Sequence, residues 1–234
     1  MKRLSLVFVL GASAFLLVGC DGYKKISEEE FNSYFSAEKV SAAKEKFAAI
    51  NCYYYEIIQT TKEFDYDLWR YNDTDYYYQY AVATVEGKKD TSHDLYLGSS
   101  NVDECKWYGV SSSGENKVTI GQEAFNQYDE QKGYERNTVT RAMDDPFYYA
   151  KEFSGNVNEK KYYVSGNKLK ITFKSSGEDQ EESSGYGIFD SKTLLVDSFV
   201  IKIKTAEASG TVKYKFTYNK SFKHKTPQDI GYKE

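Results

Sequence analysis

This sequence is poor in the residues that build metal and catalytic centres. Its 234 residues include two histidines, three cysteines and two prolines. Two histidines and three cysteines are too few for most protein metal cages. The GxSxG, HExxH, P-loop and dinucleotide-binding glycine motifs are also absent from the sequence. We therefore expect no enzyme, no metal site and no cofactor, and look for a function in binding or in architecture.

The chain also lacks an excess of positive charge. It carries 31 basic and 35 acidic residues, a formal net charge of −4. A general nucleic-acid binder needs a basic surface, so we expect no nucleic-acid partner. After the N-terminus there is no run of 18 apolar residues, which argues against a transmembrane helix. The composition, 40% hydrophobic and 28% charged, is that of a globular domain.

The N-terminus has the layout of an export signal. Lys2 and Arg3 precede an apolar stretch over 4–17, and residues 17–20 read LVGC. This ending resembles the lipobox of bacterial lipoproteins. The resemblance implies cleavage before Cys20, a diacylglycerol on its sulfur, and a lipid-anchored place on the extracytoplasmic side of the cell membrane. An ordinary signal peptide with a chance cysteine is the alternative.

The expected organisation follows from this N-terminus. Residues 1–19 form a lipoprotein signal peptide, residues 20–26 a lipidated polar tether, and residues 27–234 a single domain. The partner implied first is the membrane, reached through the N-terminal lipid, because two or more acyl chains hold a protein stably at a bilayer.

Helix signals occur at the start of the domain and again midway. Ser27 has capping-box spacing to Glu30, and apolar residues continue at helical spacing to about Ala49, with a break near Ser36. A second helix is expected over 123–131. Asp145-Pro146 predicts a third helix of about eight residues, with Asp as the N-cap and Pro at the first helical position.

Strand signals fill most of the remaining chain. Aromatic and β-branched residues predict strands over 53–61 and 76–85, with shorter ones at 95–97, 106–110 and 117–120. Near the C-terminus, apolar residues alternate with lysine and threonine over 169–173, 199–203 and 212–218. The fold class expected is α+β. A curled antiparallel sheet of eight to eleven strands, a half-barrel, packs on the N-terminal helix and one or two short inserted helices.

This order of elements is similar to that of the half-barrel carrier lipoproteins, the LolA and LppX-like proteins. Residues 188–195 (IFDSKTLL) resemble their strand, Asp-containing turn and next strand, and Lys225-Thr226-Pro227 resembles their closing proline. The resemblance implies a hydrophobic cleft that holds acyl chains.

The alternating strands supply candidates for the lining of such a cleft. We expect the concave face to carry their inward members: Tyr78, Tyr80, Ile171, Phe173, Ile201, Ile203, Tyr214 and Phe216. The ligand expected is amphipathic or lipid-like, with its apolar part against Ile and Phe and its polar part near the Tyr hydroxyls. The alternative is a surface adhesion or envelope-scaffold lipoprotein whose core is filled and holds no ligand.

Cysteine and histidine usage leaves further questions open. With Cys20 taken by lipid, Cys52 and Cys105 form an even pair in an exported chain, and we expect a disulfide between them. Two separate buried thiols are the alternative. His93 and His224 both lie in polar stretches and are expected to be solvated.

An acidic cluster and a basic face complete the candidates. Asp65, Asp67, Asp73 and Asp75 surround Trp69, and we expect a solvated loop there in preference to a Ca²⁺ site, because EF-hand spacing is missing. Seven lysines share the polar face of the final strands: Lys168, Lys170, Lys174, Lys202, Lys204, Lys213 and Lys215. Anionic headgroups or plain solvent are the two alternatives for that face.

Overall fold

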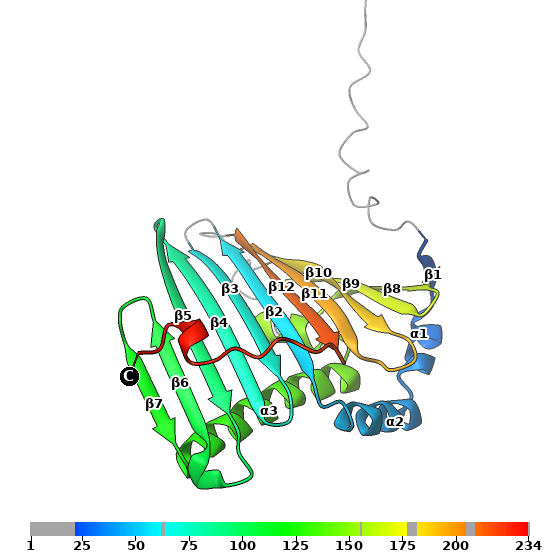
Figure 1. Cartoon of the computed structure of the whole chain (residues 1–234). Helices are drawn as coiled ribbons and strands as arrows, with labels where there is room; N and C mark the ends of the chain where they lie inside the picture. Colours follow the sequence, from blue (N-terminus) through cyan, green and yellow to red (C-terminus); the bar gives the residue numbers. More distant parts are fainter. Residues whose placement is uncertain (1–21, 62–63, 155, 177–181, 205–208, 234) are drawn as a thin grey trace, which may run out of the picture.

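Twelve strands of the chain form one antiparallel sheet (Figure 1). The computed structural model describes residues 22–61, 64–154, 156–176, 182–204 and 209–233. Within these ranges the strand order is β1-β8-β9-β10-β11-β12-β2-β3-β4-β5-β6-β7, so β1 and β7 are the open edges. The chain is therefore an α+β protein with a large, open antiparallel sheet, and this part of the predicted fold class is confirmed.

Two meanders make up the sheet. The first contains β2 (Tyr53–Thr61), β3 (Phe64–Asn72), β4 (Tyr76–Val85), β5 (Lys88–Leu97), β6 (Lys106–Ser111) and β7 (Asn116–Ile120). The second contains β8 (Glu159–Ser165), β9 (Lys168–Ser176), β10 (Glu182–Asp190), β11 (Val196–Lys204) and β12 (Ser209–Tyr218). The last strand, β12, pairs with β2 along its length and joins the meanders, while the short β1 (Lys24–Ile26) pairs with β8.

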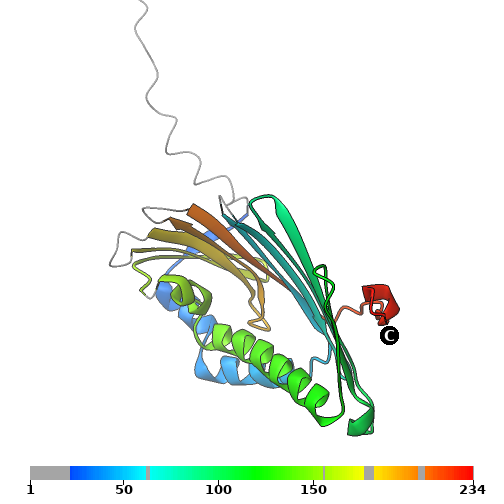
Figure 2. The same ribbon diagram turned by 90° about the vertical axis from the view of Figure 1, so that its left-hand side faces the viewer.

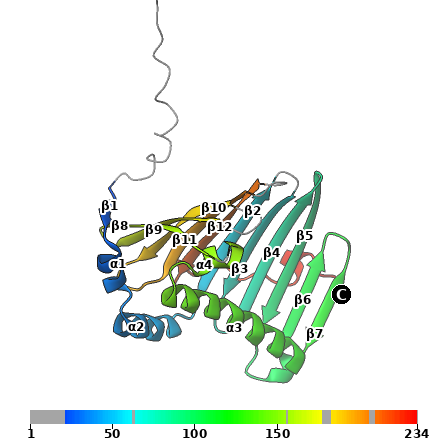
Figure 3. The same ribbon diagram turned by 180° about the vertical axis from the view of Figure 1, so that it is seen from behind.

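Four α-helices lie together on one side of the sheet, which curves around them (Figures 2 and 3). They are α1 (Glu28–Tyr34), α2 (Ala37–Ala48), α3 (Gln122–Asp144) and α4 (Tyr148–Ser154). The longest, α3, contacts β6, β7 and β11, whereas α4 contacts β10 and α1 contacts β8. We call the side that carries the helices the concave face and the opposite side the convex face.

The main core fills the space between the helices and the concave face. It joins Phe31 of α1, Phe47 of α2 and Met143 of α3 with side chains of the second meander, such as Ile171 and Phe199, all nearly inaccessible to solvent. The helices cover the apolar face of a sheet that would otherwise be wet. No helix in the described part of the chain is long and apolar enough to cross a membrane.

A segment without regular strands covers part of the convex face. Residues 219–233, which include a short 3₁₀ helix at Gln228–Ile230, cross the first meander on the side away from α3 (Figures 1 and 2). Phe222 packs on Trp69 with ring centroids 4.7 Å apart, and Tyr232 packs on Tyr108 at 4.9 Å. The first meander is therefore packed on both faces.

The helix predictions need correction in length and position. The N-terminal helix divides near Ser36, as expected: Phe35 and Ser36 separate α1 from α2, and Ser27 caps α1 by accepting a hydrogen bond from the Glu30 amide. The expected helix over 123–131 is the 23-residue α3. This helix and α4, more than the N-terminal pair, cover the centre of the sheet (Figure 3).

The strand predictions are right for β2 and β4, whose bounds agree with the structure, and wrong for the segment between them. Residues expected to form an acidic loop are strand β3. Asp65 and Asp67 alternate there with Tyr66 and Leu68, so the acids occupy the polar positions of a period-2 pattern. The many aspartates between residues 65 and 75 suggested a solvated loop, so the strand was not predicted.

The polar tether is also shorter than expected. Lys24, Lys25 and Ile26 form β1, and Ile26 is buried in the main core. Cys20, the predicted lipidation residue, lies outside the described residues. The first strand of the sheet, β1, starts at Lys24, four residues after Cys20 in the sequence.

Glycine shapes one strand of the second meander. An added Cβ on Gly187 of β10 would lie 2.6 Å from the Phe199 ring, and one on Gly185 would collide with the Val200 carbonyl. Their bare backbone lets Phe173 and Phe199, 5.6 Å apart, lie over β10. This close approach is one reason why glycine occurs inside a buried strand.

Candidate functional site

The residues expected to line a concave cleft are divided between the two faces of the sheet. Six belong to the main core or pack against it on the concave side: Ile171, Phe173, Ile201, Ile203, Tyr214 and Phe216. Tyr78 and Tyr80 belong to a separate cluster on the convex face, with Tyr76, Leu95 and Tyr108. In β4 the residues that face the helices are Tyr77, Gln79 and Ala81, so the predicted orientation of this strand was wrong.

The protein's own helices fill the centre of the concave face. Tyr149 of α4 lies 5.4 Å from Phe199, 4.9 Å from Tyr214 and 5.9 Å from Phe216, measured between ring centroids. Phe147 meets Phe173 edge-on at 6.4 Å. Four of the six predicted lining residues are consequently buried, each with 7% or less of its surface exposed: Ile171, Phe173, Ile201 and Phe216.

Beside this filled centre lies a half-buried apolar rim, which we define as Ile57, Tyr66, Ile203 and Tyr214. These side chains pack against the main core but keep part of their surface in solvent. Burial raises the pKa of the Tyr214 phenol to about 12. Tyr134, on the solvent side of α3, is 62% exposed and acts electrostatically on Tyr214. The rim thus offers aliphatic groups beside phenol hydroxyls.

A buried polar network lies under α3 and was not anticipated. Glu135 is buried, and its carboxylate accepts hydrogen bonds from Tyr53 Oη (3.1 Å) and Asn72 Nδ2 (3.3 Å). Arg70 Nη1 lies 3.4 Å from Glu135 Oε1. Burial raises the pKa of Glu135, although Arg70, Asn72 and Tyr53 counter this effect.

The network continues from Arg70 along the concave face. The Arg70 guanidinium donates to the Tyr55 hydroxyl and to Gln79 Oε1. Gln79 Nε2 donates to Asp94 at 2.9 Å, and Trp107 Nε1 donates to the same carboxylate at 3.3 Å. Polar side chains on β2 to β6 are thereby tied to one helix, which favours a single position for α3 on the sheet.

The sequence holds one signal for this network. The buried stripe of α3 runs through Tyr128, Glu135, Val139 and Ala142 at helical spacing. An acid in the middle of an apolar stripe is rare unless it is paired. The signal becomes readable only when the full length of α3 is known, because the predicted helix stopped at residue 131.

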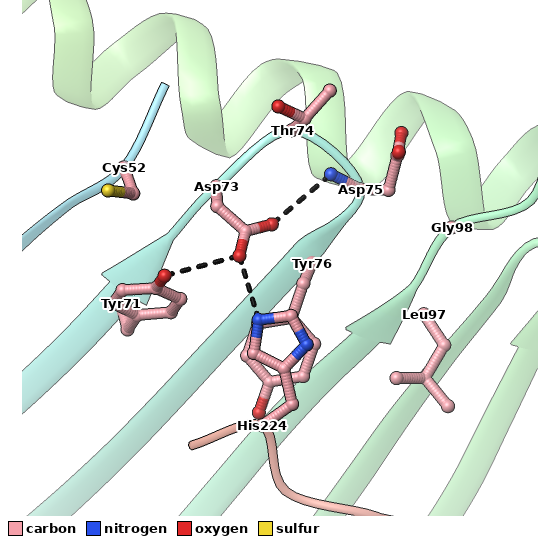
Figure 4. A pocket seen from close by; sticks show the side chains of 9 residues that line it. All are labelled: Cys52, Tyr71, Asp73, Thr74, Asp75, Tyr76, Leu97, Gly98 and His224. Atoms are coloured by element: carbon pink, nitrogen blue, oxygen red, sulfur yellow. Dashed lines mark hydrogen bonds and ion pairs between the residues drawn. The ribbon is translucent and has the colours of Figure 1, made fainter. Parts of the chain in front are cut away.

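An open pocket of about 530 Å³ lies at the turn between β3 and β4 (Figure 4). Asp73 is at its centre, accepting hydrogen bonds from His224 Nε2 at 2.8 Å and Tyr71 Oη at 3.2 Å. The His224 ring stacks flat on Tyr76, with centroids 3.8 Å apart. Since protein groups already satisfy Asp73, this arrangement holds the C-terminal segment against the sheet. His224 is thus a structural contact here and not merely solvated.

The acidic residues predicted to cluster are spread along β3. Asp65 stands near the start of the strand, and Asp73 and Asp75 follow its end in the turn before β4. About eight residues of extended chain separate Asp65 from Asp73, roughly 26 Å. Among the described residues no group of three or more His, Cys, Asp or Glu side chains is placed to hold a metal ion.

His93 and Asp94 point to opposite faces of β5, since neighbouring residues in a strand alternate. His93 Nδ1 lies 2.9 Å from Tyr78 Oη, and the ring stacks on Tyr80 at 4.7 Å. Burial lowers the pKa of His93. His93 therefore belongs to the convex aromatic cluster, while Asp94 belongs to the buried network.

The predicted disulfide is not formed in the structure, where Cys52 and Cys105 are free thiols. Cys52 packs with the convex cluster, whereas Cys105 packs with Tyr96, Trp107 and α3 on the concave side. The Tyr96 hydroxyl donates to Cys105 Sγ at 3.2 Å. The sheet lies between the two thiols, which explains why the even count was misleading.

Comparisons with known proteins do not assign the chain to a family. No protein-family model matches the sequence, and a search of curated proteins found no significant match.

Proposed function

We propose that this protein is a lipid-anchored extracytoplasmic lipoprotein with a half-barrel fold, and that it binds or carries an amphipathic ligand on its concave face. The observation that carries the proposal is the half-buried apolar rim. Ile57, Tyr66, Ile203 and Tyr214 remain partly exposed at a place where the curved sheet faces the helices.

The chemistry of the rim defines the ligand class. Aliphatic Ile57 and Ile203 suit an alkyl or ring moiety, and the phenol groups of Tyr66 and Tyr214 suit a hydroxyl, carbonyl or headgroup oxygen. A ligand with one apolar and one polar end would use both. Since the centre of the concave face is filled, a longer acyl chain would have to displace α4 and its Tyr149.

The anchor in this proposal is Cys20. The positive residues, apolar stretch and LVGC ending of 1–20 support lipidation at this cysteine. The resemblance in element order to half-barrel carrier lipoproteins supports a ligand-binding role for the domain that follows.

A second candidate function is an envelope scaffold or adhesion lipoprotein that binds no small ligand. The burial of Ile171, Phe173, Ile201 and Phe216 against α3 and α4 favours it. In that case the rim is the edge of a filled core, and the partners would be other envelope components.

Native mass spectrometry of the purified protein, followed by organic extraction, separates the two functions. We expect a bound amphipathic molecule whose occupancy falls at least about tenfold in Ile203→Lys, because a charge placed at the rim opposes an apolar guest. Val118→Lys, on the exposed edge strand β7, is the matched control and should keep the ligand. If the extracts contain no bound molecule, the carrier function is contradicted and the scaffold function is supported.

A further inference from the structure

The described chain begins against the convex face of the second meander. The Tyr23 ring lies 5.5 Å from Lys170 Nζ, and the Tyr186 ring lies 5.2 Å from the same atom. Burial raises the pKa of Tyr23, with Lys168 and Asp197 close enough to act on it. The N-terminal segment therefore enters the fold from the convex side, beside β9 and β10.

The face that Tyr23 joins is strongly basic. The strand register places nine lysines on it: Lys25, Lys161, Lys168, Lys170, Lys174, Lys202, Lys204, Lys213 and Lys215. The acids that β8–β12 place on the same face are four: Glu159, Glu182, Asp190 and Asp197. Glu56 of the neighbouring β2 lies opposite Lys215. Lys168 pairs with Asp197, and Lys174 with Glu159 at 3.2 Å.

Part of this positive charge has no salt-bridge partner within the part of the chain that the structure describes. Six lysines are exposed on this face and form no salt bridge with a described residue: Lys25, Lys161, Lys202, Lys204, Lys213 and Lys215. The chain as a whole is acidic, so this basic face is a local feature and not a reflection of composition. A local excess of positive charge on a solvent-exposed face indicates a negatively charged partner.

The length of the tether brings such a partner close. Cys20 precedes Tyr23 by three residues, which even a fully extended chain spans in about 11 Å. This step rests on the proposed lipid anchor at Cys20. If the acyl chains are in the bilayer, the part of the basic face beside Tyr23 lies about 11 Å or less from the headgroups, a distance close to the Debye length of about 10 Å at 0.1 M salt.

We propose that the convex face of β8–β12 docks on anionic phospholipid headgroups of the membrane that holds the N-terminal lipid. Lysines attract anionic headgroups only near the membrane surface, and the short tether keeps this face there. The concave face and its half-buried apolar rim then point away from the bilayer, toward the extracytoplasmic space.

The test uses the lipidated mature protein in vesicles of phosphatidylcholine alone and in vesicles with about 30 mol% phosphatidylglycerol. A pulse of an amine-reactive label, read by peptide mass spectrometry, reports the exposure of each lysine. Lys161, Lys202, Lys213 and Lys215 should react at least about fivefold more slowly in the anionic vesicles, and salt at about 0.5 M should remove this protection. Lys46, Lys88 and Lys89, which lie outside the basic face, should react equally in both.

A charge-matched pair of variants completes the test. Replacing Lys161, Lys202, Lys213 and Lys215 by Gln should remove the protection of Lys25 and Lys174, which share the face. Replacing Lys46, Lys88, Lys89 and Lys117 by Gln removes the same charge elsewhere and should leave that protection intact.

The possible failures are distinguishable. Protein that does not float with phosphatidylcholine vesicles lacks the lipid anchor, and this result would overturn the membrane anchoring in the proposed function. Protein that floats with both vesicle types and labels identically in them overturns the docking face alone. Protection seen on whole cells but absent from anionic vesicles also overturns it and identifies another anionic envelope polymer as the partner.

Discussion

Glu135 shows how much one side chain contributes to the arrangement of this molecule. Its carboxylate receives hydrogen bonds from Tyr53, Asn72 and Arg70, which come from two adjacent strands, while its own backbone belongs to α3. Removing one member of a buried ion pair leaves the other charge without a partner. The position of α3 on the sheet therefore depends on this residue more than on any exposed one of the helix.

Glu135→Ala should lower the free energy of unfolding by about 3–5 kcal/mol, because Arg70 would stay buried without a carboxylate. Urea denaturation of the purified domain measures this loss. Glu130→Ala, at an exposed position of the same helix, is the control and should change stability by less than about 0.5 kcal/mol. Equal losses in the two variants would show that the network does not stabilise the fold.

The stability difference between the wild type and Glu135→Gln should depend on pH. Burial raises the pKa of Glu135 above its ordinary value of 4.5. The folded protein then keeps this proton at pH values where the unfolded chain has lost it, so the contribution of Glu135 is greatest below pH 4.5 and falls as pH rises through the folded-state pKa. Denaturation of both proteins at a series of pH values measures the difference in their free energies of unfolding. A difference that grows with pH would contradict the raised pKa of Glu135.

The two thiols provide a direct test of the arrangement of faces. Alkylating the denatured, unreduced Cys20→Ser protein should add two alkyl groups, one each at Cys52 and Cys105. Before denaturation Cys52 should react faster, because it is half-buried whereas Cys105 is 1% exposed. A mass with no added groups would mean that the cysteines are linked after all.

At the level of elements, glycine has opposite roles in a strand and in a helix. Gly187 of β10 lies under Phe199, so a side chain there has no room. Gly133 is inside α3, and an added Cβ would meet nothing within 4 Å. Replacing glycine by alanine should therefore lower the stability of the protein at Gly187 and raise it at Gly133.

Gly187→Ala should destabilise the protein by about 1–3 kcal/mol through overpacking against the Phe199 ring. Gly133→Ala should stabilise it by about 1 kcal/mol, because alanine favours a helix interior. Thermal or urea denaturation of both variants measures the two effects under the same conditions. Destabilisation by Gly133→Ala would mean that α3 is bent or packed differently at this residue.

At the level of the whole molecule, the two faces of the sheet serve different needs. The concave face holds the helices and the half-buried apolar rim, while the convex face holds the C-terminal segment over the first meander and the basic face over the second. In the proposed arrangement the anchor enters on the convex side, so the ligand-binding side is free of the membrane.

Cys20→Ser should release the protein from membranes into the soluble fraction, because only the lipid would hold the domain there against a salt wash. Fractionation and sedimentation after the wash measure the change. Cys52→Ser leaves the lipobox intact and should remain with the membranes. A Cys20→Ser protein that still sediments would place the anchor elsewhere in the chain.

Local patterns in the sequence predicted the elements that depend on neighbours along the chain. Aromatic and β-branched residues located β2 and β4, and period-2 alternation located the apolar centres of β9, β11 and β12. Capping chemistry at Ser27 located the start of α1. Asp145 ends α3 and also accepts a hydrogen bond from the Phe147 amide, but α4 begins at Tyr148, two residues after the start predicted at Pro146. Such signals act over a few residues, and the export-signal pattern at the N-terminus is read in the same local way.

The tertiary structure decided which face of each strand is inside and which residues meet. Alternation divides a strand into two faces but does not say which of them packs on a helix, and in β4 both faces are aromatic because helices cover one and the C-terminal segment covers the other. The tertiary fold places Tyr78 and Tyr80 on the convex side and separates Cys52 from Cys105 across the sheet. It also brings Glu135 to Arg70, which lies 65 residues away in the sequence. These contacts depend on long-range packing, which the sequence specifies only through the whole fold.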